Sequence, residues 1–180
     1  LATVESDQSL TARYNRTRVV GVDFATTFGG LGVHGEAAQF FYDGSKNGDY
    51  LQYILGIDYN WTNVIYDHDI FLILEYMGDT TTQSREDKRP AFASGLGRVS
   101  RNSFLSTITY KFSDTLELET KLANNLDHHL SYVINPEINY DITDAFKLTF
   151  GIDFIEGNQT TFFGQFDNDD RSYFFLRSEE

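Results

Sequence analysis

The sequence has no cysteine, so neither a disulfide framework nor a cysteine-based zinc site is available to it. It is also poor in basic residues. Its 14 Lys and Arg stand against 27 Asp and Glu, and the net charge of −13 excludes the basic surface typical of nucleic-acid-binding proteins. No apolar run reaches the roughly 18 residues of a transmembrane helix. There are only two prolines, against 16 Phe and 11 Tyr, which favours β-structure.

Apolar and polar residues alternate through most of the chain, as in strands with two different faces. In Phe146–Phe154, one face reads Phe, Leu, Phe, Ile, Phe and the other reads Lys, Thr, Gly, Asp. We expect no helix and about nine strands. Their predicted ranges are Tyr14–Phe28, Leu31–Tyr42, Tyr50–Asn60, Val64–Tyr76, Ser100–Phe112, Thr115–Ala123, Leu130–Asp141, Ala145–Ile155 and Arg171–Arg177. The mean hydropathy of −0.36 is compatible with a membrane barrel, because only alternate strand residues of a barrel face lipid.

Short and long connections alternate along this series of strands. The short ones are Gly29-Gly30, Trp61-Thr62-Asn63, Ser113-Asp114 and Ile142-Thr143-Asp144, and the long ones are Asp43–Asp49, Met77–Val99, Asn124–His129 and Glu156–Asp170. Outer-membrane barrels have short periplasmic turns and long extracellular loops. The sorting therefore predicts an all-β, antiparallel, up-and-down transmembrane β-barrel. Met77–Val99, the longest connection, is the best candidate for a loop that folds over a pore.

Aromatic residues give a second indication of a membrane. Barrels carry aromatic girdles on the lipid face at both interfaces. Following the apolar face of four predicted strands to the short turns leads to an aromatic residue each time. The predicted girdle residues are Phe28, Tyr59, Trp61, Tyr110, Phe112 and Tyr140. A soluble β-sandwich explains the alternation equally well, but it explains neither the sorted connections nor the shared aromatic level.

The direction of the first strand indicates a larger barrel. It ends at the short Gly29-Gly30 turn and so runs inward from the outer side, which requires at least one preceding strand. Residues 1–13 are then an extracellular loop or the end of a preceding strand, and residues 14–180 form the C-terminal portion of the barrel. The opening Leu1–Glu5 has neither the basic nor the apolar region of a signal peptide.

Three stretches resemble the C-terminal portion of porin-like bacterial outer-membrane proteins, a largely uncharacterised family. They are Val20–Ala38, Tyr50–Tyr59 and Thr161–Arg171. The resemblance implies the bacterial outer membrane of a Gram-negative organism and a β-barrel, and says little about the substrate. In such proteins the last strand commonly closes on an aromatic residue, whereas this chain ends Phe174-Phe175-Leu176-Arg177-Ser178-Glu179-Glu180.

If the apolar face meets lipid, the opposite face lines the lumen. The predicted pore-lining residues are Asp23, Glu36, Asp58, Asp69, Glu75, Lys111, Glu117, Glu119, Lys121, Glu137, Lys147, Asp153 and Arg177, and His34 and Asp67 have the same parity. Their acidic excess predicts a preference for cations. The alternative is that these charges only solvate a polar wall and pair with one another. Pro136 interrupts this pattern on the apolar side, and we expect a β-bulge at Ile134–Glu137.

No metal or catalytic site stands out. In Tyr66–Asp69 the alternation sends His68 to the face opposite Asp67 and Asp69; Asp127–His129 is a solvated turn; and Asp167–Asp170 lacks the glycine and glutamate of an EF-hand. Without a Ser/His or Asp/His constellation we expect no enzyme, and we expect no cofactor.

The predicted function is passive diffusion of small hydrophilic solutes or ions through an outer-membrane porin-like channel. Its expected surroundings are outer-membrane lipid and lipopolysaccharide. A homo-oligomer and an envelope protein partner remain open. The first alternative is a structural barrel that sheathes a cytochrome or anchors a surface layer. The second is an outer-membrane hydrolase whose site lies outside this sequence.

Overall fold

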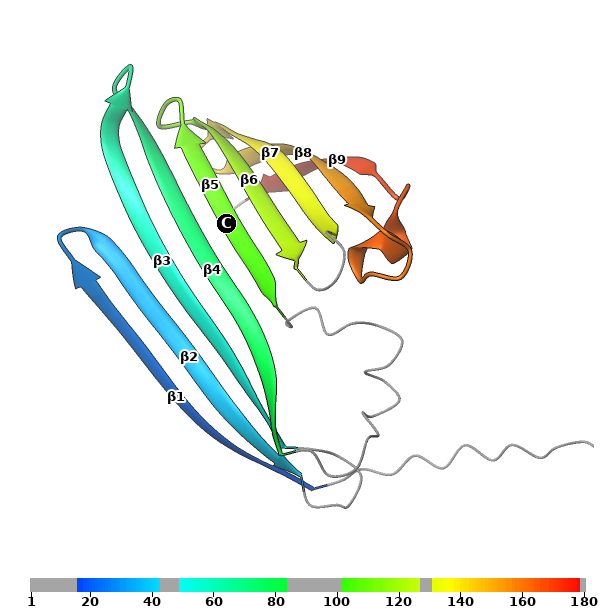
Figure 1. Ribbon diagram of the computed structural model, residues 1–180. Helices are drawn as coiled ribbons and strands as arrows, with labels where there is room; N and C mark the ends of the chain where they lie inside the picture. The colour runs from blue at the N-terminus through cyan, green and yellow to red at the C-terminus, as the bar shows by residue number, and fades with distance from the viewer. Residues whose placement is uncertain (1–15, 43–48, 84–101, 127–130, 179–180) are drawn as a thin grey trace, which may run out of the picture.

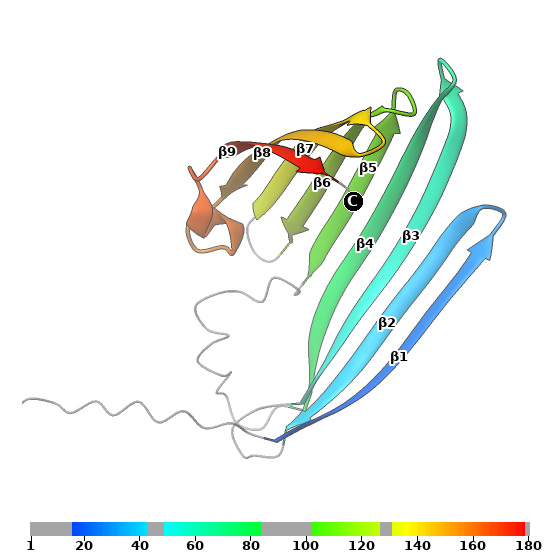
Figure 2. The same ribbon diagram turned by 180° about the vertical axis from the view of Figure 1, so that it is seen from behind.

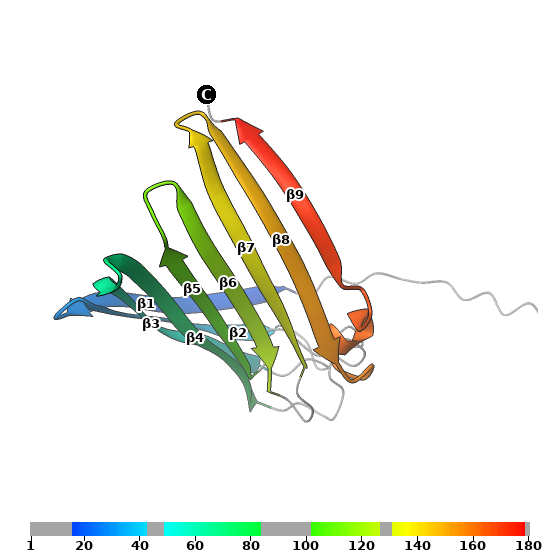
Figure 3. The ribbon, with the colours of Figure 1, turned by 90° about the horizontal axis from the view of Figure 1, so that it is seen from above.

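A computed structural model describes residues 16–42, 49–83, 102–126 and 131–178. In this part of the chain, nine strands form one antiparallel sheet in sequence order (Figure 1). Their bounds are β1 Thr17–Phe28, β2 Leu31–Tyr42, β3 Asp49–Ile65, β4 His68–Gln83, β5 Ser103–Lys111, β6 Leu116–Asn125, β7 Ser131–Thr143, β8 Phe146–Gly157 and β9 Arg171–Ser178. The prediction of nine antiparallel strands is confirmed. The sheet is open, with β1 and β9 at its edges, and Figure 3 shows that it curves without the two edges meeting.

The sheet has two chemically different faces, because residues directly opposite in an antiparallel pair point the same way. On β8 the odd-numbered Lys147, Thr149, Gly151 and Asp153 lie on one face, which we call the polar face. The even-numbered residues from Phe146 to Phe154 lie on the other, the apolar face. The strand register carries this division from β8 to every other strand of the sheet.

None of the described hydrophobic side chains is buried. The buried side chains are polar, such as Ser103, Thr109, Asn125 and Asp153. Large apolar residues remain exposed, among them Phe24 at 52% and Phe150 at 44%. A domain in water folds by burying apolar side chains between layers, and the described residues form no second layer over this face of the sheet.

One predicted turn is wrong. The sequence placed a turn at Trp61-Thr62-Asn63, but β3 continues to Ile65 and the chain turns at Tyr66 and Asp67, whose φ angles are 52° and 62°. The register shifts between Trp61 and Ile65, so this stretch is an irregular part of the strand. Asn63 allows it: its φ is 55°, and its N–H donates to Asp69 Oδ1 at 3.0 Å. Asparagine tolerates the left-handed region that such an irregularity requires.

Two of the other tight turns match the sequence prediction closely, whereas the turn predicted at Ile142-Thr143-Asp144 lies further along the chain because β7 continues to Thr143. Gly29 and Gly30, with φ angles of 56° and 89°, join β1 to β2. Residues 112–115 bend between β5 and β6, and residues 144 and 145 turn between β7 and β8. In an up-and-down sheet all four turns lie at the same end, which is the upper end in Figure 1.

The long connections are shorter than predicted where they can be described. β4 runs to Gln83, so Met77–Gln83 is strand, and residues 84–99 of the proposed pore loop lie outside the described residues. β6 ends at Asn125 and β8 at Gly157. The sequence does not predict these strand ends, because their residues are polar and lack the apolar–polar alternation that marks a strand. Residues 1–13, 43–48 and 127–129 also lie outside the described part.

The bulge predicted at Ile134–Glu137 is also wrong. Ile134 pairs with Phe154 and Glu137 with Gly151, so the register is the same on both sides of Pro136. The ladder between β7 and β8 is interrupted without a shift. Pro136 has no N–H for the residue opposite, which this register makes Ile152. The Asn135 side chain compensates, since its Nδ2 donates to the Ile152 carbonyl at 3.3 Å.

The described helical structure is a single 3₁₀ turn, η2, at Phe163–Phe166, which packs against β8 and β7. In the part of the chain that is described, no helix is both long and apolar enough to cross a membrane.

Several glycines lie directly opposite a large side chain that covers them. A Cβ on Gly78 would come 2.4 Å from Tyr53 Cζ, and one on Gly151 would come 2.3 Å from Tyr173 Cζ. Each aromatic ring therefore rests on the backbone of the neighbouring strand, and this cross-strand contact fills the space left by the missing side chain.

We expect Gly78→Ala to destabilise the protein by about 1–3 kcal/mol, because the new methyl group would displace the Tyr53 ring. Gly21→Ala is the matched control, since a Cβ there meets its nearest atom at an ordinary 3.5 Å. Urea unfolding in detergent micelles, followed by fluorescence, measures both. Equal stability of the two variants would contradict the role of the ring contact.

Candidate functional site on the polar face

The register places all the predicted pore-lining residues on the polar face. These residues are Asp23, Glu36, Asp58, Asp69, Glu75, Lys111, Glu117, Glu119, Lys121, Glu137, Lys147, Asp153 and Arg177. His34 lies on the same face, whereas Asp67 is in the turn between β3 and β4. The coverage of these charged side chains differs widely: Glu137 is 17% exposed and Asp153 is 10% exposed, whereas Lys121 is 50% exposed.

The polar face divides into two parts of different charge. On β1–β4 it carries only acidic charges and no Lys or Arg; they are Asp23, Glu36, Asp58, Asp69, Glu75 and Asp79. We call this the acidic part. On β5–β9 five acidic residues balance five basic ones. The acids there are Glu117, Glu119, Glu137, Asp141 and Asp153, and the bases are Lys111, Lys121, Lys147, Arg171 and Arg177. We call this the balanced part.

His34 lies at the centre of the acidic part. Its Nε2 is 3.0 Å from Glu75 Oε1, and its Nδ1 is 3.8 Å from Asp58 Oδ1. Gly56 allows this approach, because a Cβ there would come 2.2 Å from His34 Nε2. The imidazole therefore bridges carboxylates on β3 and β4.

In the balanced part the charges pair across strands. Lys121 lies between two carboxylates, with Nζ 2.7 Å from Glu119 Oε1 and 2.9 Å from Glu137 Oε2. Lys147 pairs with Asp141 at 3.4 Å. Paired charges of this kind largely cancel at a distance, so the balanced part contributes little net field.

Asn135 connects this pairing to β8 and β9. Besides the Ile152 carbonyl, its Nδ2 lies 2.6 Å from Asp153 Oδ1 and 2.6 Å from Tyr173 Oη. The Tyr173 hydroxyl donates to Glu137 Oε1, and Arg171 Nε donates to Asp153 Oδ2. A continuous hydrogen-bonded network thus runs from Glu119 on β6 to Arg171 on β9.

Sequence reasoning missed Asn135, Arg171 and Tyr173. The signal was available in their parity, since Arg171 and Tyr173 have the same parity on β9 as the predicted pore-lining Arg177. A wide-open cavity of about 350 Å³ lies on the sheet surface beside the network and is lined by Asn135, Glu137, Asp153, Arg171, Tyr173 and Phe175.

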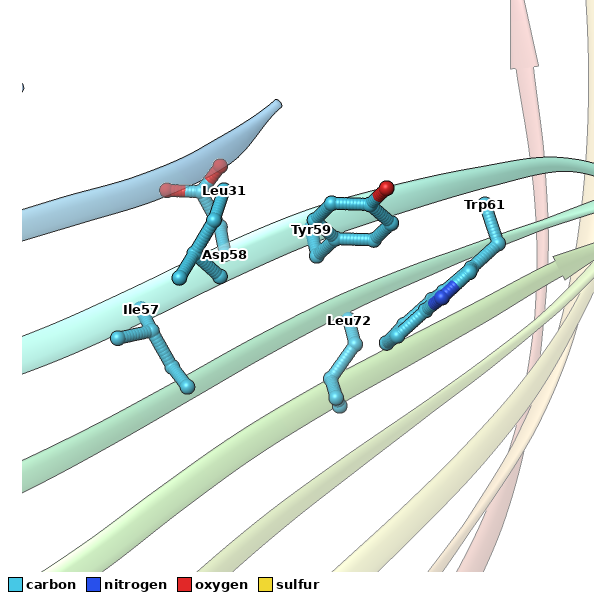
Figure 4. Close-up of a pocket in the computed structure, with 6 residues that line it drawn as sticks. All are labelled: Leu31, Ile57, Asp58, Tyr59, Trp61 and Leu72. Carbon is cyan, nitrogen blue, oxygen red and sulfur yellow. The ribbon is translucent and has the colours of Figure 1, made fainter. Parts of the chain in front are cut away.

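The predicted girdle residues all lie on the apolar face near the tight turns. Trp61 on β3 and Tyr110 on β5 lie at the same level of the sheet, because each is paired with Ile70 on β4. Ring centroids are 4.7 Å apart in Tyr59–Trp61 and also in Tyr110–Phe112. Phe28 is 67% exposed and Tyr140 44%. A shallow apolar hollow of about 330 Å³ lies there, lined by the residues labelled in Figure 4: Leu31, Ile57, Asp58, Tyr59, Trp61 and Leu72.

The described residues contain no group of three His, Cys, Asp or Glu side chains placed to hold a metal ion. His68 and Asp69 point to opposite faces, as the alternation predicted, and His68 Nδ1 lies 2.7 Å from Tyr110 Oη. Asp127–His129 lies outside the described residues.

Comparisons with models of protein families, with curated proteins and with solved structures give no match to this chain.

We expect Asn135→Ala to lower the free energy of unfolding by about 1–3 kcal/mol. The substitution removes the side-chain amide that replaces the missing Pro136 N–H and donates a hydrogen bond to Asp153. The control is Asn139→Ala, on the same strand and face, whose side chain accepts one hydrogen bond from Thr149. Urea unfolding in micelles should show the larger loss for Asn135→Ala. The reverse order would contradict the central place of Asn135 in the network.

Proposed function

We propose that this chain forms part of the wall of a bacterial outer-membrane β-barrel, with the apolar face against lipid and the polar face lining an aqueous channel. The channel carries small hydrophilic solutes and ions by passive diffusion and prefers cations. The observation that carries the proposal is the uncovered apolar face combined with the absence of any buried hydrophobic side chain among the described residues.

Contact with lipid would explain why the apolar face is uncovered. Exposed apolar patches on soluble monomers are usually limited to a few hundred Å². Here exposed Val, Ile, Leu, Phe and Trp side chains lie on strands across the whole sheet, from Val22 on β1 to Phe174 on β9. Ladder hydrogen bonds satisfy the backbone within the sheet, as a membrane requires. The strands have 8 to 17 residues, and about 9–11 suffice to cross a bilayer.

The two sheet edges bear on how such a barrel would close. In an antiparallel sheet of nine strands β1 and β9 run in the same direction, and both edges are open in Figure 2. An all-antiparallel barrel that includes this sheet needs an odd number of further strands between these edges. This agrees with the resemblance to the C-terminal portion of porin-like proteins.

The separation of the polar face into an acidic part and a balanced part supports the cation preference. Rings and rows of fixed carboxylates attract cations into a pore and repel anions. Asp23, Glu36, Asp58, Asp69 and Glu75 lie on the polar face of β1–β4, and the described residues of these strands place no Lys or Arg on that face, whereas the balanced part contributes no net charge. The side chains of Asp58 and Glu75 are 39% and 32% exposed and so remain accessible to solvent.

We expect the protein, reconstituted in planar lipid bilayers, to give a cation-selective reversal potential under a KCl gradient. Asp58→Asn combined with Glu75→Gln should lower the cation-to-anion permeability ratio by a factor of about 2, because two of the carboxylates beside His34 lose their charge.

The matched control is Asp141→Asn combined with Lys147→Gln, which removes an ion pair and leaves the net charge unchanged. It should keep the selectivity of the unmodified protein. An anion-selective pore would contradict the cation preference, and a protein that inserts but conducts no current would contradict the channel.

We expect Phe150→Arg to destabilise the membrane-inserted protein by about 2–4 kcal/mol, the cost of a lipid-facing arginine near the bilayer midplane. Thr149→Arg, one residue away on the polar face, should cost less than half as much. Urea unfolding from liposomes compares the two. A larger loss for Thr149→Arg would reverse the assignment of the two faces.

A further inference from the structure

We propose that the cavity beside the Asn135 network binds a neutral polyhydroxylated solute, such as a single sugar ring. The inference rests on the proposed function, because it requires the polar face to be in contact with water and with diffusing solutes. Lining residues come from three adjacent strands, β7, β8 and β9, and the volume of about 350 Å³ falls in the range of small-molecule sites.

An aromatic surface forms one wall of the cavity. Phe175 is 60% exposed, and it is the one strongly exposed large apolar side chain on the polar face of β5–β9. Its ring centroid is 5.2 Å from that of Tyr173, with the planes inclined at 40°. The carbon-bound hydrogens on one face of a sugar ring form an apolar surface that packs on such rings, which a simple ion cannot do.

The remaining walls favour a neutral ligand over an ion. Every carboxylate oxygen in the cavity already accepts a hydrogen bond: Glu137 from Tyr173 and Lys121, and Asp153 from Asn135 and Arg171. Because Lys121 pairs with Glu137 and Arg171 pairs with Asp153, the cavity has no excess charge that would favour a cation or an anion.

The hydrogen-bond donors and acceptors that the network leaves available suit the hydroxyl groups of a sugar. Arg171 bonds Asp153 through Nε, and its side chain is 74% exposed, so the terminal guanidinium nitrogens are left as donors. Each carboxylate oxygen also has a second lone pair. A hydroxyl group both donates and accepts, so a ring with several hydroxyls can use the arginine and the carboxylates together.

The test compares three probes with the same ring and different charge: glucose, glucosamine and glucuronate. Binding to the detergent-solubilised protein is measured by titration calorimetry, and block of the ion current is measured in planar bilayers. We expect glucose to bind more tightly than either charged probe and to reduce the current in a saturable way.

Phe175→Ala should weaken glucose binding by about tenfold, and Arg171→Gln should weaken it as well. Phe174→Ala is the matched control: this neighbouring phenylalanine is 63% exposed but faces the apolar side, so glucose binding should not change. Urea unfolding in detergent micelles shows whether each variant is folded.

The calorimetric arm does not depend on conduction, so failure of the channel and failure of the sugar site are distinguishable. Absence of glucose binding, tighter binding of either charged probe, or equal loss in Phe174→Ala and Phe175→Ala would overturn the sugar site. A protein that binds glucose without conducting would support the site and contradict the channel.

Discussion

The apolar face of the sheet is left uncovered by the described part of the chain, and the proposal of a membrane barrel depends on this feature. Among the described residues no hydrophobic side chain is buried, and Phe24, Leu55 and Phe150 are each more than 40% exposed. The hydrophobic effect therefore cannot stabilise this sheet by internal burial. In a bilayer the same side chains would meet lipid, and the sheet needs only its ladder hydrogen bonds and cross-strand contacts to define the fold.

Among the described residues, the hydrogen bonds and ion pairs between side chains of different strands are concentrated on the polar face. There the Asn135 network ties β6, β7, β8 and β9 together, and Tyr173 rests on Gly151. In the acidic part, His34 is the one basic side chain among the described residues, and it lies beside Asp58 and Glu75. One face thus combines a tightly paired region, suited to binding a neutral solute, with a negatively charged region, suited to attracting cations.

Much of this organisation could be predicted from sequence because its basis is a period of two. Alternation located the strands and assigned residues such as Asp58 and Lys121 to one face, since parity along a strand fixes the side. It could not locate the turn at Tyr66, because Asn63 bends the chain without ending the strand. Nor could it show that an asparagine side chain replaces the N–H that Pro136 lacks, because that bond joins residues 17 positions apart.

Site-directed spin labelling along β8 tests the orientation of the faces most directly, and the chain suits it because it has no cysteine of its own. Single cysteines introduced from Phe146 to Phe154 would carry a nitroxide in liposome-embedded protein. Accessibility to oxygen, which concentrates in lipid, should peak at the even positions, and accessibility to a water-soluble nickel chelate should peak at the odd ones. The opposite phase, or no alternation, would contradict the assignment of the apolar face to lipid.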